Sequence, residues 1–189
     1  TVNAFNAEKY EDAIKYAEEA IESAKAANYK EALEQSKYVM ALSYEVLKNT
    51  DKANELYREL IKENTKKPDV YIKIFAANQA AKETDKAINV LKRGVKNLPE
   101  NAQLKALLGS TYLANGNKEE AEKIIQSLLA LGEKKEVFNY VGDIYRDASD
   151  ITKAEEYYNK SLALEPAQSD AYFGLASTYF NKGIDVLKE

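Results

Sequence analysis

The chain has 189 residues, of which 45% are hydrophobic and 31% are charged, and its formal net charge is −4. This balance predicts a folded, soluble chain rather than a disordered one, and the acidic charge argues against a nucleic-acid partner, which requires a basic surface. No apolar run approaches the roughly 18 residues of a membrane-spanning helix, so membrane insertion is not expected.

Histidine, cysteine and tryptophan are missing from the sequence. Without cysteine the chain has neither a disulfide nor a thiolate site, and without histidine it lacks the commonest general base and transition-metal ligand. Asp143, Asp147 and Asp150 resemble a carboxylate cluster, but no glycine-centred calcium loop surrounds them. We interpret them as helix and helix-cap residues, and we expect no enzyme activity, no cofactor and no metal site.

Residues 1–33 are predicted to form an irregular N-terminal helical cap. Apolar residues recur at helical spacing between positions 8 and 27, as in Tyr10, Ile14 and Ile21, and Asn28 ends this helix. A second helix over 29–48 then continues into the following segment. A degenerate repeat with a lengthened helix is the alternative interpretation, but terminal repeats are often atypical, which favours a cap.

From residue 34 onwards, one pattern recurs with a period of 34 or 33 residues. Four alanines carry this period: Ala53, Ala87, Ala121 and Ala154. A second series lies nine positions before them and consists of Tyr44, Asn78, Tyr112 and Tyr145, continued by Tyr179. A fixed period of this length is typical of stacked repeats, in which no unit buries its apolar face alone.

The period divides the chain into repeats 34–67, 68–101, 102–134 and 135–168 and a truncated last repeat, 169–189. Each repeat contains two segments with helical spacing, separated by Asn, Asp, Ser or Thr residues that can end one helix and cap the next. The helices expected along the chain are 8–27, 29–48, 51–64, 68–81, 84–97, 102–114, 118–131, 135–147, 151–164 and 169–181. A further helix is expected to begin near Gly183.

This pattern resembles the tetratricopeptide repeat, a helix–turn–helix unit of 34 residues. The best match is repeat 135–168, where the family positions are filled by Phe138, Val141, Gly142, Tyr145, Ala154, Tyr158 and Pro166. The resemblance implies an all-α fold, a right-handed α-solenoid of stacked antiparallel helix pairs that forms a single domain over residues 1–189. Its small residues, which include Ala41, Gly109, Gly142 and Ala176, should lie where paired helices approach closely.

In this family the first helix of each pair lines a concave groove, and this implies a set of candidate binding residues. The candidates are Tyr38, Leu42, Glu45, Ile72, Glu136, Asn139, Asp143, Arg146, Asp170, Phe173 and Phe180. The groove of the first repeats is expected to be apolar and neutral, whereas the last two repeats add carboxylates, one arginine and two phenylalanines. The basic clamp by which some members bind chaperone C-termini has no counterpart here, because Tyr38, Leu42 and Gln103 occupy its cationic positions.

The resemblance therefore implies a non-catalytic scaffold that binds a polypeptide segment in the groove. Four groove positions in each repeat were counted, and their net charge is −4. They contain one basic residue, Arg146, and five acidic residues: Glu45, Asp69, Glu136, Asp143 and Asp170. A partner with basic and apolar residues would fit this balance.

The alternative is an assembly module that self-associates, or stacks on other repeats, through its open ends. Its contact surface would include Ile184 and Leu187, which no later repeat covers in this chain. The sequence starts without methionine, and we interpret it as a processed chain or a fragment. The compartment is left open, with an exported or periplasmic chain favoured over a cytoplasmic one.

Overall fold

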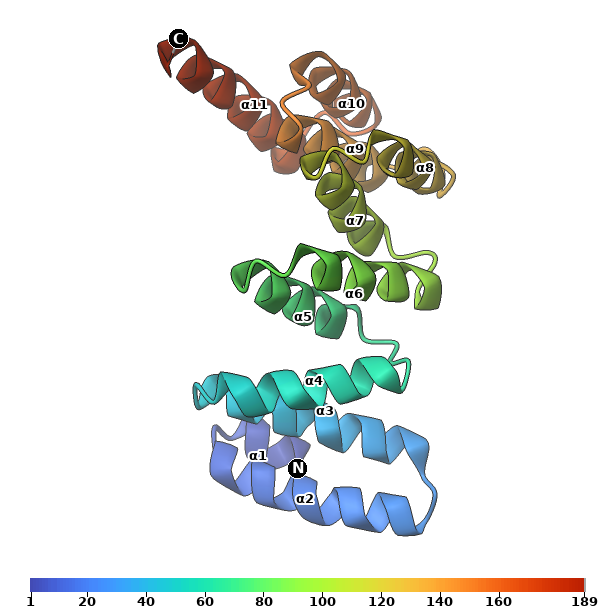
Figure 1. Ribbon diagram of the computed structural model, residues 1–189, viewed down its shortest axis with the longest axis vertical. Helices are drawn as coiled ribbons and strands as arrows, with labels where there is room; N and C mark the ends of the chain where they lie inside the picture. The colour runs from blue at the N-terminus through green and yellow to red at the C-terminus, as the bar shows by residue number, and fades with distance from the viewer. Residues whose placement is uncertain (189) are drawn as a thin grey trace. The chain divides into compact units, whose positions relative to one another are not determined.

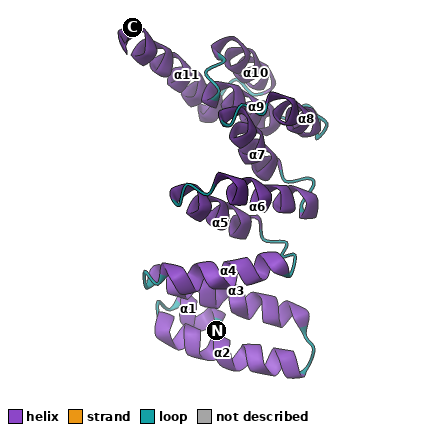
Figure 2. Cartoon of the chain, in the orientation of Figure 1, coloured by secondary structure: helices purple, strands orange, loops and turns teal. Residues whose placement is uncertain are grey.

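Helices account for nearly the whole of the computed structural model, which describes residues 1–188, with side chains up to residue 183; no strand occurs among these residues (Figures 1 and 2). The helices are α1 (Val2–Asn6), α2 (Tyr10–Ala26), α3 (Lys30–Val46), α4 (Thr50–Lys62), α5 (Pro68–Ala80), α6 (Thr84–Asn97), α7 (Ala102–Ala114), α8 (Lys118–Leu129), α9 (Lys135–Asp147), α10 (Ile151–Leu164) and α11 (Ser169–Lys188). The all-α prediction is confirmed, and the bounds of α2 to α10 agree with the predicted ranges to within two residues.

Two predicted ends are wrong. Helix α1 was not predicted, because five residues are too few to show a helical period; Phe5 packs edge-on against Tyr10 there, with ring centroids 5.4 Å apart. At the other end, α11 continues through Gly183 instead of ending at residue 181 before a new helix. One glycine lowers helix stability by only about 1 kcal/mol and does not force a break. The side chains of Ile184 and Leu187 lie outside the described residues.

The turn inside each helix pair has the same backbone geometry from repeat to repeat. Its last residue takes a positive φ, at Lys48 (60°), Lys82 (58°), Gly116 (75°) and Ser149 (59°). The next backbone N–H donates to the carbonyl five residues earlier, as from Asn49 to Tyr44 (2.8 Å) and from Asp150 to Tyr145 (2.9 Å). This bond closes the end of the first helix. The side chains of Asn49 and Asp150 then cap the second helix, as predicted.

Contacts between residues divide the chain into two compact parts, residues 1–90 (unit 1) and residues 91–189 (unit 2), with the division inside α6. In unit 1, α2 packs on α3, α3 on α4, and α4 on α5. The largest fully buried side chains of this unit are Tyr57, Leu60, Val70, Tyr71 and Ile74. Ala41 and Ala53 are buried as predicted, so the small residues allow the paired helices α3 and α4 to approach closely.

In unit 2, α7 packs on α8 and α9, α9 on α10, and α11 on both α9 and α10. Its buried core includes Ile125, Leu128, Val137, Val141, Ile144, Tyr145, Ala154 and Tyr158. Tyr112 and Tyr145 are buried, whereas Tyr179 is 47% exposed. The prediction for Ala176 is wrong: it is exposed on α11, because no second helix among the described residues covers that face.

One buried side chain in unit 2 carries a charge without an ion pair to a described residue. The ammonium of Lys105 in α7 donates to the backbone carbonyl of Ser127 at 2.7 Å, and only 6% of the residue is exposed. At the same position of repeat 34–67, the ammonium of Lys37 is paired with Glu59 (2.9 Å) and Glu63 (2.6 Å). Burial lowers the pKa of Lys105. For Lys37 the same effect of burial is outweighed by the two glutamates, and its pKa is raised.

Replacing Lys105 by methionine should raise the free energy of unfolding near pH 7 by roughly 1 kcal/mol or more, because it removes an unpaired buried charge. A lowered pKa means that folding disfavours the ammonium. The loss of folding stability caused by the Lys105 ammonium is therefore complete below the folded-state pKa. It disappears as the pH rises towards the ordinary lysine pKa of 10.5. Urea unfolding near pH 7 and near pH 10 measures this difference. Lys37→Met is the control and should not stabilise; a Lys105→Met variant that is less stable near pH 7 contradicts the prediction.

Candidate functional site

A concave pocket of about 590 Å³ lies in unit 2, lined by residues of α9 and of the start of α11; we call it the unit 2 pocket. It is lined by Glu136, Asn139, Tyr140, Asp143, Arg146, Ser169, Asp170 and Phe173. Six of these eight are predicted groove residues. They come together because positions three or four residues apart share one face of a helix, and α9 and α11 are the first helices of consecutive repeats. Tyr140 and Ser169 were not among the predicted residues.

The rim of the unit 2 pocket holds two carboxylates that form no ion pair with a described residue. Glu136 and Asp170 are both exposed, and Asp170 receives only a long hydrogen bond, 3.3 Å, from the Ser169 hydroxyl. The ring of Phe173 stands beside them with 71% of the residue exposed. The Lys135 ammonium, which is ion-paired with Glu165, lies close enough to Glu136 and Asp170 for their charges to contribute to its raised pKa. The rim therefore combines two carboxylates that form no ion pair of their own with open aromatic surface.

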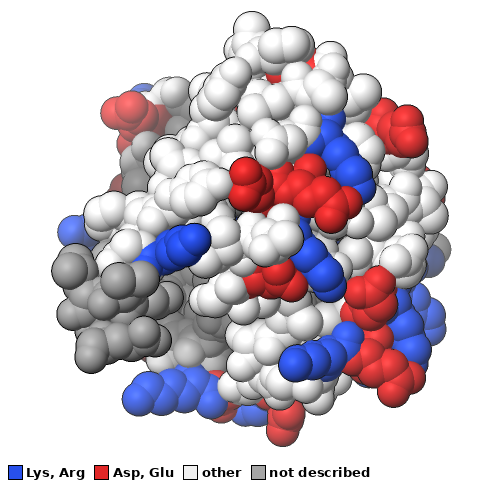
Figure 3. Space-filling view, turned by 90° about the horizontal axis from the view of Figure 1, so that it is seen from above, with Lys and Arg blue, Asp and Glu red and all other residues white. Residues whose placement is uncertain are grey.

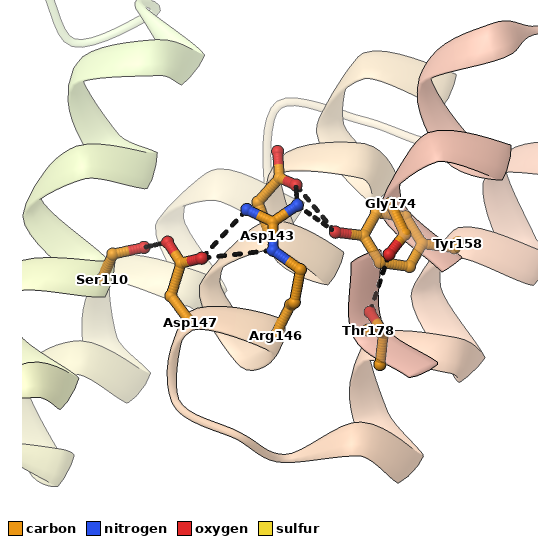
Figure 4. Close-up of polar contacts among 7 residues, drawn as sticks. All are labelled: Ser110, Asp143, Arg146, Asp147, Tyr158, Gly174 and Thr178. Carbon is orange, nitrogen blue, oxygen red and sulfur yellow. Dashed lines mark hydrogen bonds and ion pairs between the residues drawn. The ribbon is translucent and has the colours of Figure 1, made fainter. Parts of the chain in front are cut away.

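At the inner end of the pocket, by contrast, every charge is paired (Figure 4). The Arg146 guanidinium donates to Asp143 Oδ1 at 2.6 Å and to Asp147 Oδ1 at 2.9 Å. Asp143 also accepts from the Tyr158 hydroxyl at 2.7 Å, and Asp147 accepts from Ser110 in α7 at 3.2 Å. These bonds hold Arg146 in one place in the lining of the pocket.

Burial and the neighbouring charges set the protonation of the groups in the pocket. Burial raises the pKa of Asp143, although the hydrogen bonds from Tyr158 and Arg146 act against this change. Burial and the Asp143 carboxylate raise the pKa of Tyr158, so its hydroxyl stays protonated and can donate. The pKa of Tyr140 is raised by burial and by the carboxylates of Asp143, Glu136 and Asp170. The Tyr140 hydroxyl is therefore neutral and lies in a negative field.

Tyr158 reaches this network from α10 by passing between two glycines. A Cβ atom added to Gly142 in α9 would lie 2.7 Å from Tyr158 Cε1, and one added to Gly174 in α11 would lie closer still. Real Cβ atoms do not approach a ring so closely, so both positions require glycine while the ring is there. Gly142 fills the family's small position and was predicted, whereas Gly174 was missed. A glycine inside a helical pattern was the available signal.

Replacing Gly174 by alanine should lower the free energy of unfolding by roughly 1–3 kcal/mol, because the new methyl group overpacks against the Tyr158 ring. The control is Gly183→Ala, where no atom lies within 4 Å of the added Cβ and a small gain, up to about 1 kcal/mol, is expected. The same glycine change is then measured in a Tyr158→Leu background by thermal and urea unfolding. An equal cost in both backgrounds would show that the ring is not the obstacle.

Asn139 contributes a buried acceptor without a partner. Its Nδ2 donates to Gln168 Oε1 at 2.9 Å, while Gln168 Nε2 donates to the carbonyls of Ser161 (2.8 Å) and Glu165 (3.1 Å). These bonds fix the orientation of both amides. Asn139 Oδ1 is consequently the one buried side-chain polar atom in the described residues that lacks a hydrogen bond.

The predicted groove residues of unit 1 have a different environment. Tyr38 donates its hydroxyl to Asp69 at 2.5 Å, and the ammonium of Lys67 lies 4.6 Å from the centre of its ring. Glu45 is ion-paired with Lys73 at 2.7 Å and accepts from the Tyr57 hydroxyl. Leu42 and Ile72 are half-buried, and Phe180 of unit 2 is 68% exposed outside the pocket lining.

The groove residues of the first repeats are therefore not purely apolar, because charged side chains of both signs lie among them. Lys67 and Lys73 balance the acids Glu45 and Asp69, and neither lysine belongs to the four positions that gave the charge of −4. Both are long side chains that reach across from neighbouring positions. The excess negative charge of the concave residues belongs to unit 2 alone.

Within the described part of the chain, no three acidic side chains are placed to hold a metal ion. None of the helices in residues 1–188 combines the length and the apolar character that crossing a membrane requires. On the face shown in Figure 3, acidic and basic side chains are intermingled with uncharged surface.

Two family profiles match the chain, and both describe a tetratricopeptide repeat. One matches residues 47–109 and 79–139, and the other matches residues 142–185. A search of curated protein sequences finds no relative.

Several solved structures are similar. TTC0263, a thermophilic tetratricopeptide repeat protein of Thermus thermophilus, has 20% identity and a TM-score of 0.58, with 95% of each chain covered. A tetratricopeptide repeat protein from Parabacteroides merdae has 20% identity and a TM-score of 0.63, covering 92% of this chain and 73% of its own. YrrB has 16% identity and a TM-score of 0.59, covering 90% and 85%. At these identities the likeness concerns the fold, and together with the profile matches it shows that the chain belongs to the tetratricopeptide repeat family.

Proposed function

We propose that this protein is a non-catalytic interaction scaffold whose unit 2 pocket binds a polypeptide segment with a basic side chain. Proteins of this family generally bind other proteins or peptides. YrrB, one of the similar structures, is described as having an unusual peptide-binding site. The observation that carries the proposal is the unpaired carboxylates of Glu136 and Asp170 beside the exposed ring of Phe173.

The charge of the pocket favours a cationic partner. Three carboxylates and one guanidinium line it, and that guanidinium is already bound by Asp143 and Asp147. Negative charge therefore remains at the rim, where it can attract a basic segment and repel an acidic one. The attraction should weaken with salt, because exposed charges are screened.

Affinity should depend mainly on the aromatic surface. A single exposed carboxylate contributes at most about 1 kcal/mol to an ion pair, whereas a buried aromatic anchor often contributes more. Phe173 and, farther along α11, Phe180 offer this surface. The groove residues of unit 1 already satisfy one another, so we do not expect them to select the charge of a partner.

Selection of a displayed library of random twelve-residue peptides on the purified protein should enrich peptides with a basic and an apolar residue. The Glu136→Lys, Asp170→Lys double variant should lose binding of these peptides at least tenfold, because it reverses the charge at the rim. Asp143 is a poorer choice, since its loss would break the Arg146 and Tyr158 contacts.

The matched control is Glu11→Lys, Glu18→Lys on the exposed face of α2, which changes the net charge equally and should leave binding intact. Circular dichroism verifies the fold of each variant. If both double variants bind the selected peptides like the wild type, the binding site is not this pocket. The same conclusion follows if the enriched peptides lack basic residues.

A second candidate function, assembly through α11, is favoured by the exposure of Tyr172 (55%) and Tyr179 (47%). In the preceding repeat, the equivalent Phe138 and Tyr145 pack against Tyr157 of α10. Light scattering over a range of concentrations should then show a dimer for the wild type. The double variant Tyr172→Ser, Tyr179→Ser should be monomeric. A chain that is monomeric at every concentration tested excludes this function.

A further inference from the structure

We infer that the unit 2 pocket selects arginine over lysine, by placing the guanidinium of a bound segment on the Phe173 ring between Glu136 and Asp170. This inference rests on the function proposed above and names the side chain that the rim recognises. It is carried by three features of the pocket: the kind of polar groups at the rim, the open aromatic ring, and the way in which the pocket holds its own arginine.

The charged groups at the rim are hydrogen-bond acceptors. The carboxylates of Glu136 and Asp170 come from the same position of two consecutive repeats, on α9 and α11, and both face one pocket. Each can accept several N–H bonds. A guanidinium presents five N–H donors in a planar fork that can serve two carboxylates at once, whereas an ammonium is a compact charge with three donors and a stronger hold on water.

The ring of Phe173 is open, whereas lysines cover several tyrosine rings of this chain. Lysine ammonium groups lie over the rings of Tyr157 (4.4 Å from the ring centre), Tyr38 (4.6 Å), Tyr145 (4.7 Å) and Tyr44 (5.0 Å). Among the described residues no cation and no second ring covers Phe173, which is 71% exposed. A planar guanidinium can stack on this face and keep its edge free for the carboxylates.

The inner end of the pocket shows how this surface accommodates a guanidinium. Arg146 lies there with donors on Asp143 and Asp147 and with its Nη1 3.1 Å from the Tyr158 hydroxyl (Figure 4). Those two acids are therefore used within the chain. Only the other two acids of the lining, Glu136 and Asp170, remain for a partner, in a cavity of about 590 Å³.

Tyr140 adds to the field at the rim. Its hydroxyl stays neutral because burial and the surrounding carboxylates of Asp143, Glu136 and Asp170 oppose its ionisation, which raises its pKa. The polar contribution of Tyr140 is thus a dipole, and the local charge is that of the acids. A cation that enters meets one carboxylate from α9 and one from α11, and neither forms an ion pair with a described residue.

The test uses three small probes: N-acetyl-arginine methylamide, the lysine equivalent, and the citrulline equivalent, which keeps the shape of arginine without its charge. Each is titrated into the full chain at low ionic strength, and backbone amide shifts are followed by NMR. The arginine probe should shift residues of α9 and of the first turns of α11 and bind roughly three- to fivefold more tightly than the lysine probe, the gain expected from stacking on an exposed ring. The citrulline probe should give no saturable shift.

Three variants give the test its controls. The Phe173→Leu variant should bind the arginine and lysine probes with equal affinity. The double variant Glu136→Gln, Asp170→Asn should bind neither probe. The control double variant Glu11→Gln, Glu18→Gln on α2 should bind both probes like the wild type. Equal binding of the arginine and lysine probes to the wild type overturns the inference, as does an arginine probe that shifts no residue of the pocket. If displayed peptides still require the rim acids in that case, the proposed function stands and only the preference for arginine is lost.

Discussion

The packing of Tyr158 between Gly142 and Gly174 sets the relation of α9 to α11, and the unit 2 pocket depends on it. The Tyr158 ring fills the space between α9 and α11 so closely that neither helix can carry a Cβ at the position that faces it. Because the ring comes from α10, the second helix of the pair holds both walls of the pocket. Its hydroxyl then reaches the pocket lining and fixes Asp143 and, through it, Arg146.

The repeats around this site show how one backbone pattern serves different electrostatic purposes. The turn with a positive φ and its closing hydrogen bond recurs in each pair, although only Gly116 among the four turn residues is glycine. The same turn places Glu45 of unit 1 and Arg146 of unit 2 at equivalent positions near the end of the first helix. In unit 1 a lysine neutralises the glutamate, and in unit 2 two aspartates neutralise the arginine.

The contrast between paired and unpaired charge identifies the candidate site better than the number of charges does. Buried charges are costly unless they are paired; Lys37 follows that rule with its two glutamates, whereas Lys105 has only a backbone carbonyl as partner. Exposed carboxylates carry no such cost and can remain open for a partner. Glu136 and Asp170 are exposed carboxylates of this kind. They are candidates for binding because they line the unit 2 pocket together with the exposed ring of Phe173.

The sequence by itself determined the period, the bounds of nine helices and six of the eight residues of the pocket, because helical spacing and turn chemistry are local properties. Only the tertiary structure decided which charges are free. Lys73 reaches Glu45 from 28 positions away, and Gly174 is required by a ring 16 positions earlier; no short-range pattern encodes such contacts. Likewise Ala176 matches the family position, yet it is exposed because burial depends on the helix that packs opposite and not on the residue itself.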